Sequence, residues 1–471
     1  MFYLLLPYAR AGHMAESMNK TMTYPGHFRA IAVLGLPLVG GHLAQFAIGL
    51  TDTIMLGWYG VEALAAVTLA SSYYFVLFLF GAGFGWAVMP MVATAAAEED
   101  ETSIRRSTRM GLWLSLIYAA LMMPLLWWSY PVLIALKQEP DVAETASQYL
   151  RVAGWGLFPA LIVMVLKSYL AALERTQIVL WITVVAALVN GLTNYALIFG
   201  NWGAPELGVI GAAIASVVTQ IVSLIFVVIY AVRALPEHSL FQRFWRPDWE
   251  MFFSVLRLGV PIGLTTLAEV SLFAMSAIMM GWLGKVPLAA HGIALNLASA
   301  TFMVHLGLSN AATIRAGNAL GRRDRAHLEK GAIAVTAMSL VMSILTIILF
   351  LTCAEPLISL FMEANDPQRG QILAIGTGLL AMAALFQLVD GAQVIALGLL
   401  RGLQDAKVPM VMAALSYWIV GIPTSYYFGF VYGMEGIGVW LGLVLGLACA
   451  AVLLMARFWM RSVRTVGVPA E

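Results

Sequence analysis

The stretch LGVPIGLTTLAEVSLFAMSAIMMGWLG, residues 258–284, decides the fold. It is apolar over a length that can cross a bilayer as one helix, and it carries a single acid, Glu269, near its middle. A matching stretch, LGLPLVGGHLAQFAIGLTDTIMLGWYG, occupies residues 34–60. Aligned without a gap, both begin with Leu-Gly-x-Pro and end with Ile-Met-x-Gly-Trp-x-Gly, and the acid of the earlier copy is Asp52. The sequence therefore predicts a duplicated membrane protein.

The composition excludes an ordinary soluble domain. Of the 471 residues, 61% are hydrophobic and only 11% are charged, whereas charged residues make up about a quarter of a soluble domain. In lipid every backbone polar group must be paired internally, so such a chain spans the membrane as helices or as a closed barrel. Its apolar runs of roughly twenty residues fit helices rather than short alternating strands. The net charge of +1 gives no sign of nucleic-acid binding.

Twelve apolar segments are predicted to cross the membrane. They lie at residues 31–57, 64–90, 110–136, 149–173, 178–200, 208–232, 256–283, 288–314, 331–353, 371–400, 408–430 and 437–460. An even number of helices in each copy makes both copies enter the membrane in the same direction, so the repeat is parallel and a cavity is expected between the halves. A duplicated channel or membrane enzyme is also possible, so the repeat favours a transporter without proving one.

The predicted fold is an all-α polytopic membrane protein with twelve transmembrane helices in two six-helix lobes. The expected parts are an N-terminal segment, a first lobe, an inter-lobe linker, a second lobe and a tail. In that order they occupy residues 1–30, 31–232, 233–255, 256–460 and 461–471. Basic residues gather in the loops after even-numbered segments and in both tails, which predicts that both termini face the cytoplasm.

Two acids of the second lobe are predicted to lie at the same depth. Glu269 lies twelve residues after Arg257, and Asp390 lies eleven residues before Arg401. At about 1.5 Å per helical residue, both fall roughly 16–18 Å from the cytoplasmic end. A charge at the bilayer centre costs about 2.5–3.5 kcal/mol on insertion scales, so such acids suggest function, here a shared cation or proton site. The alternative is two acids with separate structural hydrogen bonds.

A second polar group is predicted in the first lobe. Asp52 reaches a depth comparable to that of Asn190 and Asn194, which are four residues apart and so share one helix face. A carboxylate with two amide carbonyls suits a hard cation or a proton, and Ser216 can add a hydroxyl. The alternative is an amide network that holds helices together.

Pro37 and its counterpart Pro261 interrupt their helices at corresponding positions. A proline removes one backbone hydrogen bond, so each is a candidate hinge, with a static kink as the alternative. The sequence contains no phosphate-binding GxxxxGK[ST] motif, no HExxH and no GxSxG. We therefore expect neither ATP hydrolysis nor another enzymatic activity in this chain, and transport would be driven by an ion gradient.

Longer motifs resemble the MATE (multidrug and toxic compound extrusion) family, specifically its NorM-type bacterial branch. They are TDTIMLGWYG at 51–60, PIGLTTLAEVSLF at 261–273, AAHGIALN at 289–296, RAGNALGRRD at 315–324 and FQLVDGAQVIALGLLRGLQD at 386–405. The resemblance implies a two-lobed antiporter of the bacterial cytoplasmic (inner) membrane, which exports cationic drugs and dyes in exchange for Na⁺ or H⁺. It implies no organic cofactor, no nucleic acid and no obligate protein partner.

The resemblance also implies roles for individual residues. Glu269 and Asp390 would form the second-lobe cation site, which would hold Na⁺ if the protein is sodium-coupled. Asp52, Asn190, Asn194 and Ser216 would form the first-lobe site, and Pro37 would mark the bend of the first helix. Possible cavity-lining residues are Gln45, His291, Asn296, Phe386 and Gln387. Family members often have tyrosine where this chain has Phe386, and glutamine where it has Gly292.

Two other functions remain open on the sequence. A flippase for a lipid-linked precursor has a related architecture, but it would need a strongly basic cavity, and the apolar segments here offer mainly acids plus Lys167. A passive channel is less expected, and it would show flux that does not depend on a counter-ion.

Overall fold

The computed structural model describes residues 22–362 and 367–467. Within these ranges every regular element is helical, and twelve helical stretches are long and apolar enough to cross a membrane. This confirms the predicted all-α fold with twelve membrane-crossing helices. The six stretches of the first half are α2 (Tyr24–Tyr59), α3 (Val61–Ala97), α4 (Glu101–Trp127), α6–η3–α7 (Pro140–Ala153, Gly154–Gly156, Leu157–Ala172), α8 (Thr176–Phe199) and α9 (Gly208–Ala234).

The second half repeats this arrangement. Its six stretches are α10 (Trp249–Leu283), α11 (Lys285–Gly321), α12 (Arg325–Thr352), α14 (Arg369–Gly402), α15–η6–α16–η7 (Lys407–Leu415, Ser416–Gly421, Ile422–Tyr426, Tyr427–Val431) and α17–η8–α18 (Glu435–Arg457, Phe458–Ser462, Val463–Thr465). Short helices connect some of them: α5 (Ser129–Ala135), η4 (Asn201–Gly203), η5 (Pro236–His238) and α13 (Ala354–Ser359).

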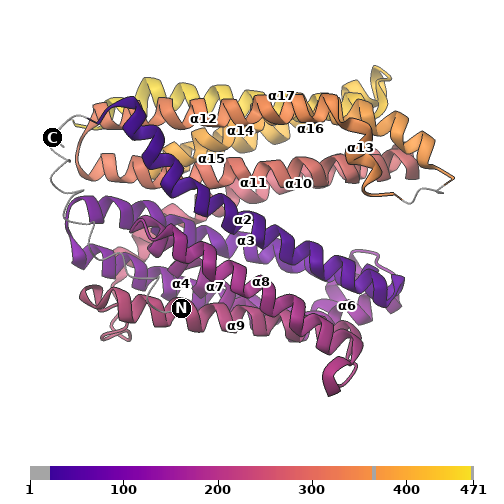
Figure 1. Ribbon diagram of the computed structural model, residues 1–471, viewed down its shortest axis with the longest axis horizontal. Coiled ribbons are helices and arrows are strands. Elements are labelled where there is room, and N and C mark those ends of the chain that lie inside the picture. Colours follow the sequence, from indigo (N-terminus) through magenta and orange to yellow (C-terminus); the bar gives the residue numbers. More distant parts are fainter. Residues whose placement is uncertain (1–21, 363–366, 468–471) are drawn as a thin grey trace.

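The helices form two lobes that lie side by side (Figure 1). Helix α2 packs against α8 of its own lobe and against α11 and α12 of the other lobe. In the reciprocal arrangement, α10 packs against α3 and α4 of the first lobe and against α15 of its own, the counterpart of α8. The first helix of each lobe therefore crosses onto the second helix of the other, as expected for a repeat about one axis.

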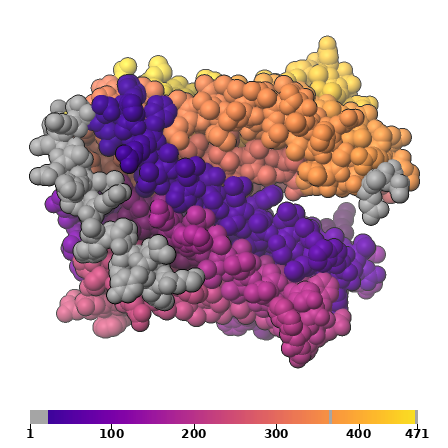
Figure 2. Space-filling view, in the orientation of Figure 1, coloured from indigo at the N-terminus to yellow at the C-terminus, as the bar shows by residue number. Residues whose placement is uncertain are grey.

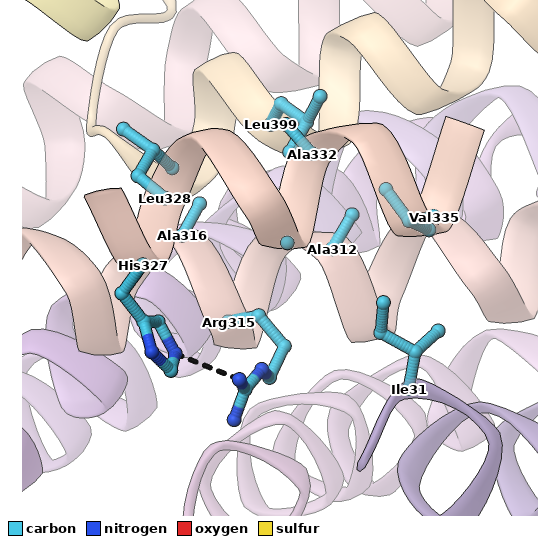
Figure 3. A pocket seen from close by; sticks show the side chains of 10 residues that line it. Ile31, Ala312, Arg315, Ala316, His327, Leu328, Ala332, Val335 and Leu399 are labelled. Atoms are coloured by element: carbon cyan, nitrogen blue, oxygen red, sulfur yellow. Dashed lines mark hydrogen bonds between the residues drawn. The ribbon is translucent and has the colours of Figure 1, made fainter. Parts of the chain in front are cut away.

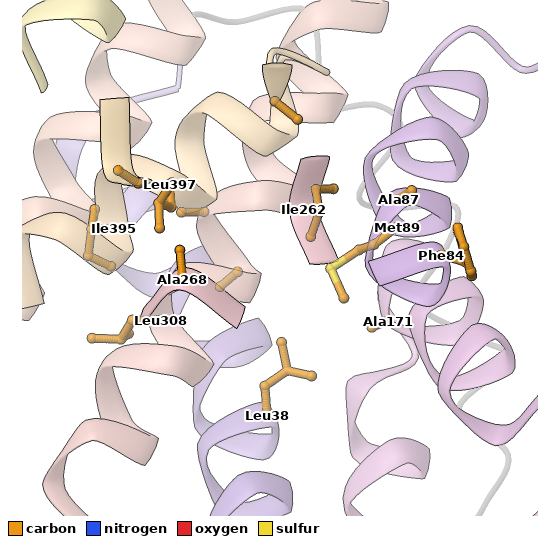
Figure 4. Packing of buried hydrophobic residues seen from close by; sticks show 14 of the residues in the cluster. Leu38, Phe84, Ala87, Met89, Ala171, Ile262, Ala268, Leu308, Ile395 and Leu397 are labelled. Atoms are coloured by element: carbon orange, nitrogen blue, oxygen red, sulfur yellow. The ribbon is translucent and has the colours of Figure 1, made fainter. Parts of the chain in front are cut away.

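The lobes pack tightly at one end, called here the closed end, where α3 leads into α4 and α11 leads into α12. A Cβ atom on Gly83 would lie 2.6 Å from the carbonyl oxygen of Gly259, so α3 and α10 touch through their backbones. A Cβ on Gly321 would likewise overlap the carbonyl oxygen of Thr94, which brings α11 against α3. Buried apolar side chains from both lobes fill this region (Figure 4).

The lobes separate toward the opposite end, called here the open end, where α6 and α13 lie. Figure 2 shows a cleft between the lobes at this end. At the turn from α2 to α3, Trp58 is 74% exposed and Val61 is 81% exposed, and Trp282 near the end of α10 is 61% exposed. The molecule is thus a two-lobed bundle that opens on one side only.

Several helices begin before the apolar segments from which they were predicted. Helix α10 begins at Trp249, and the expected lobe boundary at residue 256 lies inside it. The reason is a capping carboxylate: Asp248 accepts a hydrogen bond from the Met251 amide at 3.1 Å. Asp100 caps α4 in the same way. Helix α2 begins at Tyr24 and continues through Pro37, so this proline does not end the helix.

Candidate functional site

The two acids of the second lobe lie near each other. Glu269 comes from α10 and Asp390 from α14, and the two carboxyl groups are within electrostatic range of each other. Asp390 is almost completely buried. Because charges in a low-dielectric interior interact strongly, the charge state of either acid depends on the other.

Two further side chains complete this group, and the sequence analysis did not identify them. The Gln393 amide donates a 2.6 Å hydrogen bond to the Tyr417 hydroxyl, and Gln393 also lies against Glu269. Tyr417 is fully buried in η6, a π-helical stretch, and such stretches are frequent at functional sites. Gln393 is three residues after Asp390, so helical spacing could have found it. Nothing in the sequence singles out Tyr417.

Several oxygen atoms of this group have no hydrogen-bond partner. In the described part of the chain, Asp390 Oδ1, Gln387 Oε1 and Gln393 Oε1 are buried and unpaired. These residues are spaced by three along α14 and so follow one face of the helix. Buried polar atoms are normally paired, so these three oxygens are acceptors available to a bound proton, water or cation. Oxygen ligands are those that hard cations prefer.

The metal ligands that this group offers are carboxylate and amide oxygens. Among residues 22–362 and 367–467, no cluster of three or more His, Cys, Asp or Glu side chains is positioned to hold a metal ion. A site for a transition metal is therefore not built from these residues. Two carboxylates with amide oxygens suit a monovalent hard cation or a proton.

The residues expected to line a cavity fall into two sets. Phe386, His291 and Gln387 are buried inside the second lobe. Phe386 packs against the ring of Trp440 at 5.7 Å between centroids, and the Trp440 indole donates to His291 Nδ1 at 3.0 Å. By contrast, Gln45 and Asn296 are exposed.

In the first lobe, Asp52 of α2 lies against the two asparagines of α8. The Asn194 amide donates to Asp52 Oδ1 at 2.5 Å and to Asn190 Oδ1 at 3.2 Å. Both asparagines are fully buried, whereas Asp52 is partly accessible. The Asn190 side chain also lies within hydrogen-bonding reach of Asp52, and among the described residues Asn194 Oδ1 has no partner. This buried oxygen is therefore available to a ligand.

A tyrosine that the sequence analysis missed closes this group. Tyr149 of α6 is largely buried, and its hydroxyl lies within hydrogen-bonding reach of Ser216 and Ser71. It also lies within electrostatic range of Asp52. Ser216 therefore contacts the tyrosine that lies near the acid. The first lobe therefore holds one partly accessible acid surrounded by amides and hydroxyls.

A small cavity at the closed end lies between α2, α11 and α12, and Figure 3 shows its lining. Its volume of about 10 Å³ is that of roughly one water molecule, so it cannot hold an organic substrate. Beside it, the Arg315 guanidinium is hydrogen-bonded to His327 Nε2 at 2.7 Å and to His27 Nδ1 at 3.3 Å. His27 belongs to the first lobe, so this cluster joins the lobes at the closed end.

Comparisons of the sequence with known proteins agree over most of the chain. The family model described as MatE matches residues 37–196 and 261–427, one stretch in each half. A probable multidrug resistance protein NorM of Rhizobium meliloti (strain 1021) is 44% identical over 460 residues, which cover 97% of this chain and 98% of that protein. The protein of the same name from Agrobacterium fabrum (strain C58 / ATCC 33970) is 45% identical over 434 residues, covering 92% and 93%.

Solved structures show a similar fold. The crystal structure of the eukaryotic MATE transporter AtDTX14 superposes with a TM-score of 0.83 at 18% identity and covers 94% of this chain and 99% of that chain. An outward-facing multidrug resistance MATE family transporter of the MOP superfamily superposes with a TM-score of 0.85 at 21% identity, covering 94% and 97%. At these identities the likeness concerns the fold.

Proposed function

Because this chain belongs to the MatE family, we propose that it is a multidrug efflux antiporter that exchanges external Na⁺ or H⁺ for organic cations from the cell. The relatives at 44% and 45% identity carry the name of multidrug resistance proteins. The coupling ion is the driving substrate, and the exported molecules are small organic cations such as drugs and dyes. The protein needs no organic cofactor for this exchange.

One observation carries the coupling part of the proposal, namely the unpaired oxygens around the two acids of the second lobe. Two neighbouring carboxylates repel each other when both are charged, and a bound Na⁺ or H⁺ relieves that repulsion. Gln387 and Gln393 supply further oxygens to a cation held at Asp390 and Glu269. When the cation leaves, the two carboxylates repel each other again. Release of the ion therefore costs free energy, which the ion gradient across the membrane can supply.

The two ends of the molecule support alternating access. We propose that the closed end faces the cytoplasm, because arginines gather there, in the first turns of α4 (Arg105, Arg106 and Arg109) and at the turn from α11 to α12 (Arg322, Arg323 and Arg325). The described conformation would then be open to the outside, with both termini in the cytoplasm of a bacterium. One elementary charge that crosses a potential of 100 mV supplies about 2.3 kcal/mol, and a concentration gradient adds to it.

The first-lobe group suits contact with the exported cation or with a coupling proton. Asp52 is partly accessible, Asn190 and Asn194 lie against it, and Asn194 Oδ1 has no hydrogen-bond partner among the described residues. A cationic substrate in the cleft would find here a carboxylate that is not neutralised by a basic residue. Pro37 lies on the same helix as Asp52, so bending at this proline would move the acid relative to α8.

The test is transport of a fluorescent organic cation in proteoliposomes with sodium and proton gradients imposed separately. We expect Glu269→Gln and Asp390→Asn each to abolish gradient-driven export while the protein still inserts and purifies normally. Glu355→Gln, which removes one exposed carboxylate near the open end, is the matched control and should transport like the wild type. Normal export by both acid variants would remove these residues from the mechanism, and flux without any counter-ion dependence would indicate a channel.

A further inference from the structure

The segment that joins the lobes, residues 235–248 and called here the strap, is fixed to α4 through its backbone. The Arg109 guanidinium donates to the carbonyl oxygens of Leu240 at 3.2 Å and Gln242 at 2.6 Å. The Trp113 indole donates to the carbonyl oxygen of Phe244 at 2.9 Å. Three carbonyls on alternate residues are thus held by one helix, so the strap has a defined shape.

Residues between these anchors and directly after them present their side chains outward. Phe241, Arg243, Trp245 and Arg246 are all exposed, and Trp245 is 73% exposed. Contact between the large aromatic ring of Trp245 and water would be energetically unfavourable. Such side chains are typical of the boundary between lipid tails and headgroups.

The middle of the strap is positively charged. Its two acids, Glu237 and Asp248, equal its two arginines in number but lie toward its ends. Asp248 accepts two hydrogen bonds from Arg106, at 2.5 and 3.1 Å, and Arg106 also binds Glu250 at 2.9 Å. Residues 239–247 carry Arg243 and Arg246 and no acid, and in the described part of the chain neither arginine forms an ion pair.

The surroundings of the strap locate it at the surface of the bilayer. It connects the end of α9 with the start of α10, two membrane-crossing helices. The first turn of α10 adds two more exposed aromatic residues, Trp249 and Phe253, whose rings lie 6.5 Å apart. Basic residues beside aromatic ones at this depth attract anionic phospholipids.

We propose that the strap is a binding site for an anionic phospholipid, whose phosphate contacts Arg243 and Arg246 and whose acyl chain lies along Trp245. The exposed aromatic residues favour a lipid over a free phosphate, because a soluble anion would leave them in water. Since Asp248 and Arg106 join the first turn of α10 to α4, the lipid binds where the second lobe is attached to the first.

The experiment measures lipid binding by native mass spectrometry on the purified, delipidated full chain. We expect dioleoyl phosphatidylglycerol to bind the wild type more tightly than dioleoyl phosphatidylcholine. The double variant Arg243→Gln/Arg246→Gln should bind phosphatidylglycerol about thirtyfold more weakly, since each basic residue at a membrane surface contributes about a factor of five. The matched control, Arg322→Gln/Arg323→Gln, removes two exposed arginines at the closed end and should bind as the wild type does.

Three results would overturn the proposal. The first is equal affinity of the wild type for the two lipids, and the second is unchanged phosphatidylglycerol binding in the double variant. The third is displacement of the lipid by inorganic phosphate at matched concentration, which would indicate a site for a free anion. If the double variant does not fold, hydrogen exchange of the wild type decides the question. Residues 239–247 should exchange more slowly with phosphatidylglycerol than with phosphatidylcholine, and equal exchange would refute the proposal.

Discussion

Replacing Gly83 by alanine is expected to weaken the closed end of the transporter. The added Cβ would lie 2.6 Å from the carbonyl oxygen of Gly259 and 2.8 Å from the amide nitrogen of Gly263. Both are backbone atoms, so no side-chain rotation can relieve the overlap. Ordinary carbon contacts begin near 3.5 Å, and α3 and α10 must therefore separate by about 0.9 Å.

The size of the effect follows from the cost of overpacking. Forcing an extra methyl group into a packed region costs about 1–3 kcal/mol. Alanine is also a better helix former than glycine by up to about 1 kcal/mol. If α3 stays helical in both the closed and the opened conformation, the gain in helix stability is the same in both and does not change the equilibrium between them. The substitution should therefore shift the equilibrium away from closure at this end by about five- to 150-fold.

The assay is the distance between two spin labels at the closed end, on Glu99 and Arg322, after the native cysteines have been replaced. In Gly83→Ala, a longer distance should be populated that is minor in the wild type. Gly292→Ala is the control, because a Cβ at that position in α11 meets no atom within 4 Å. An unchanged distance distribution in Gly83→Ala would show that this glycine contact does not keep the lobes closed.

Three other substitutions test single contacts. Asn194→Ala should reduce export less than loss of an acid does and should change its ion dependence, and unchanged ion dependence would favour a purely structural role. Arg106 holds the pKa of Asp248 below its usual value of 3.8, so this pair stabilises the fold above that pH and the contribution is lost as the pH falls. Asp248→Asn should therefore lower the thermal midpoint at pH 7, and the difference from wild type should shrink on acidification. Tyr417→Phe leaves the Gln393 amide buried without its acceptor, which should cost about 1–3 kcal/mol in the free energy of unfolding.

The fold was predictable because the signals that define it are long and repeated. A membrane-crossing helix requires about twenty apolar residues, and such runs are visible without a partner sequence. The helix ends were less predictable, because they depend on single polar residues outside the apolar run. Asp248 extends α10 by a turn and a half or more beyond its apolar part, and only the hydrogen bond to the Met251 amide reveals this.

The positions of the candidate site residues were predictable where the geometry depends on spacing along one helix or on equal depth in two helices. Asn190 and Asn194 share a helix face because of their spacing alone, and the depth of Glu269 and Asp390 follows from the nearest arginines. Tyr149 and Tyr417 were missed for a physical reason. A tyrosine in an apolar segment can serve as packing or as a hydroxyl donor, and its role depends on what the neighbouring helices present.

The two lobes repeat the fold without repeating the chemistry. In the gap-free alignment of residues 34–60 with residues 258–284, Gln45 stands where the second lobe has Glu269, and Ser276 stands where the first lobe has Asp52. Gln45 is exposed, and the buried Ser276 hydroxyl is bound within its own helix to the carbonyl oxygen of Phe273. The two acids therefore do not occupy equivalent positions of the repeat, and one lies partly accessible among amides while the other lies beside a second, buried acid. Sites this different can select different ligands, which is what the proposed exchange of a coupling ion for an organic cation needs.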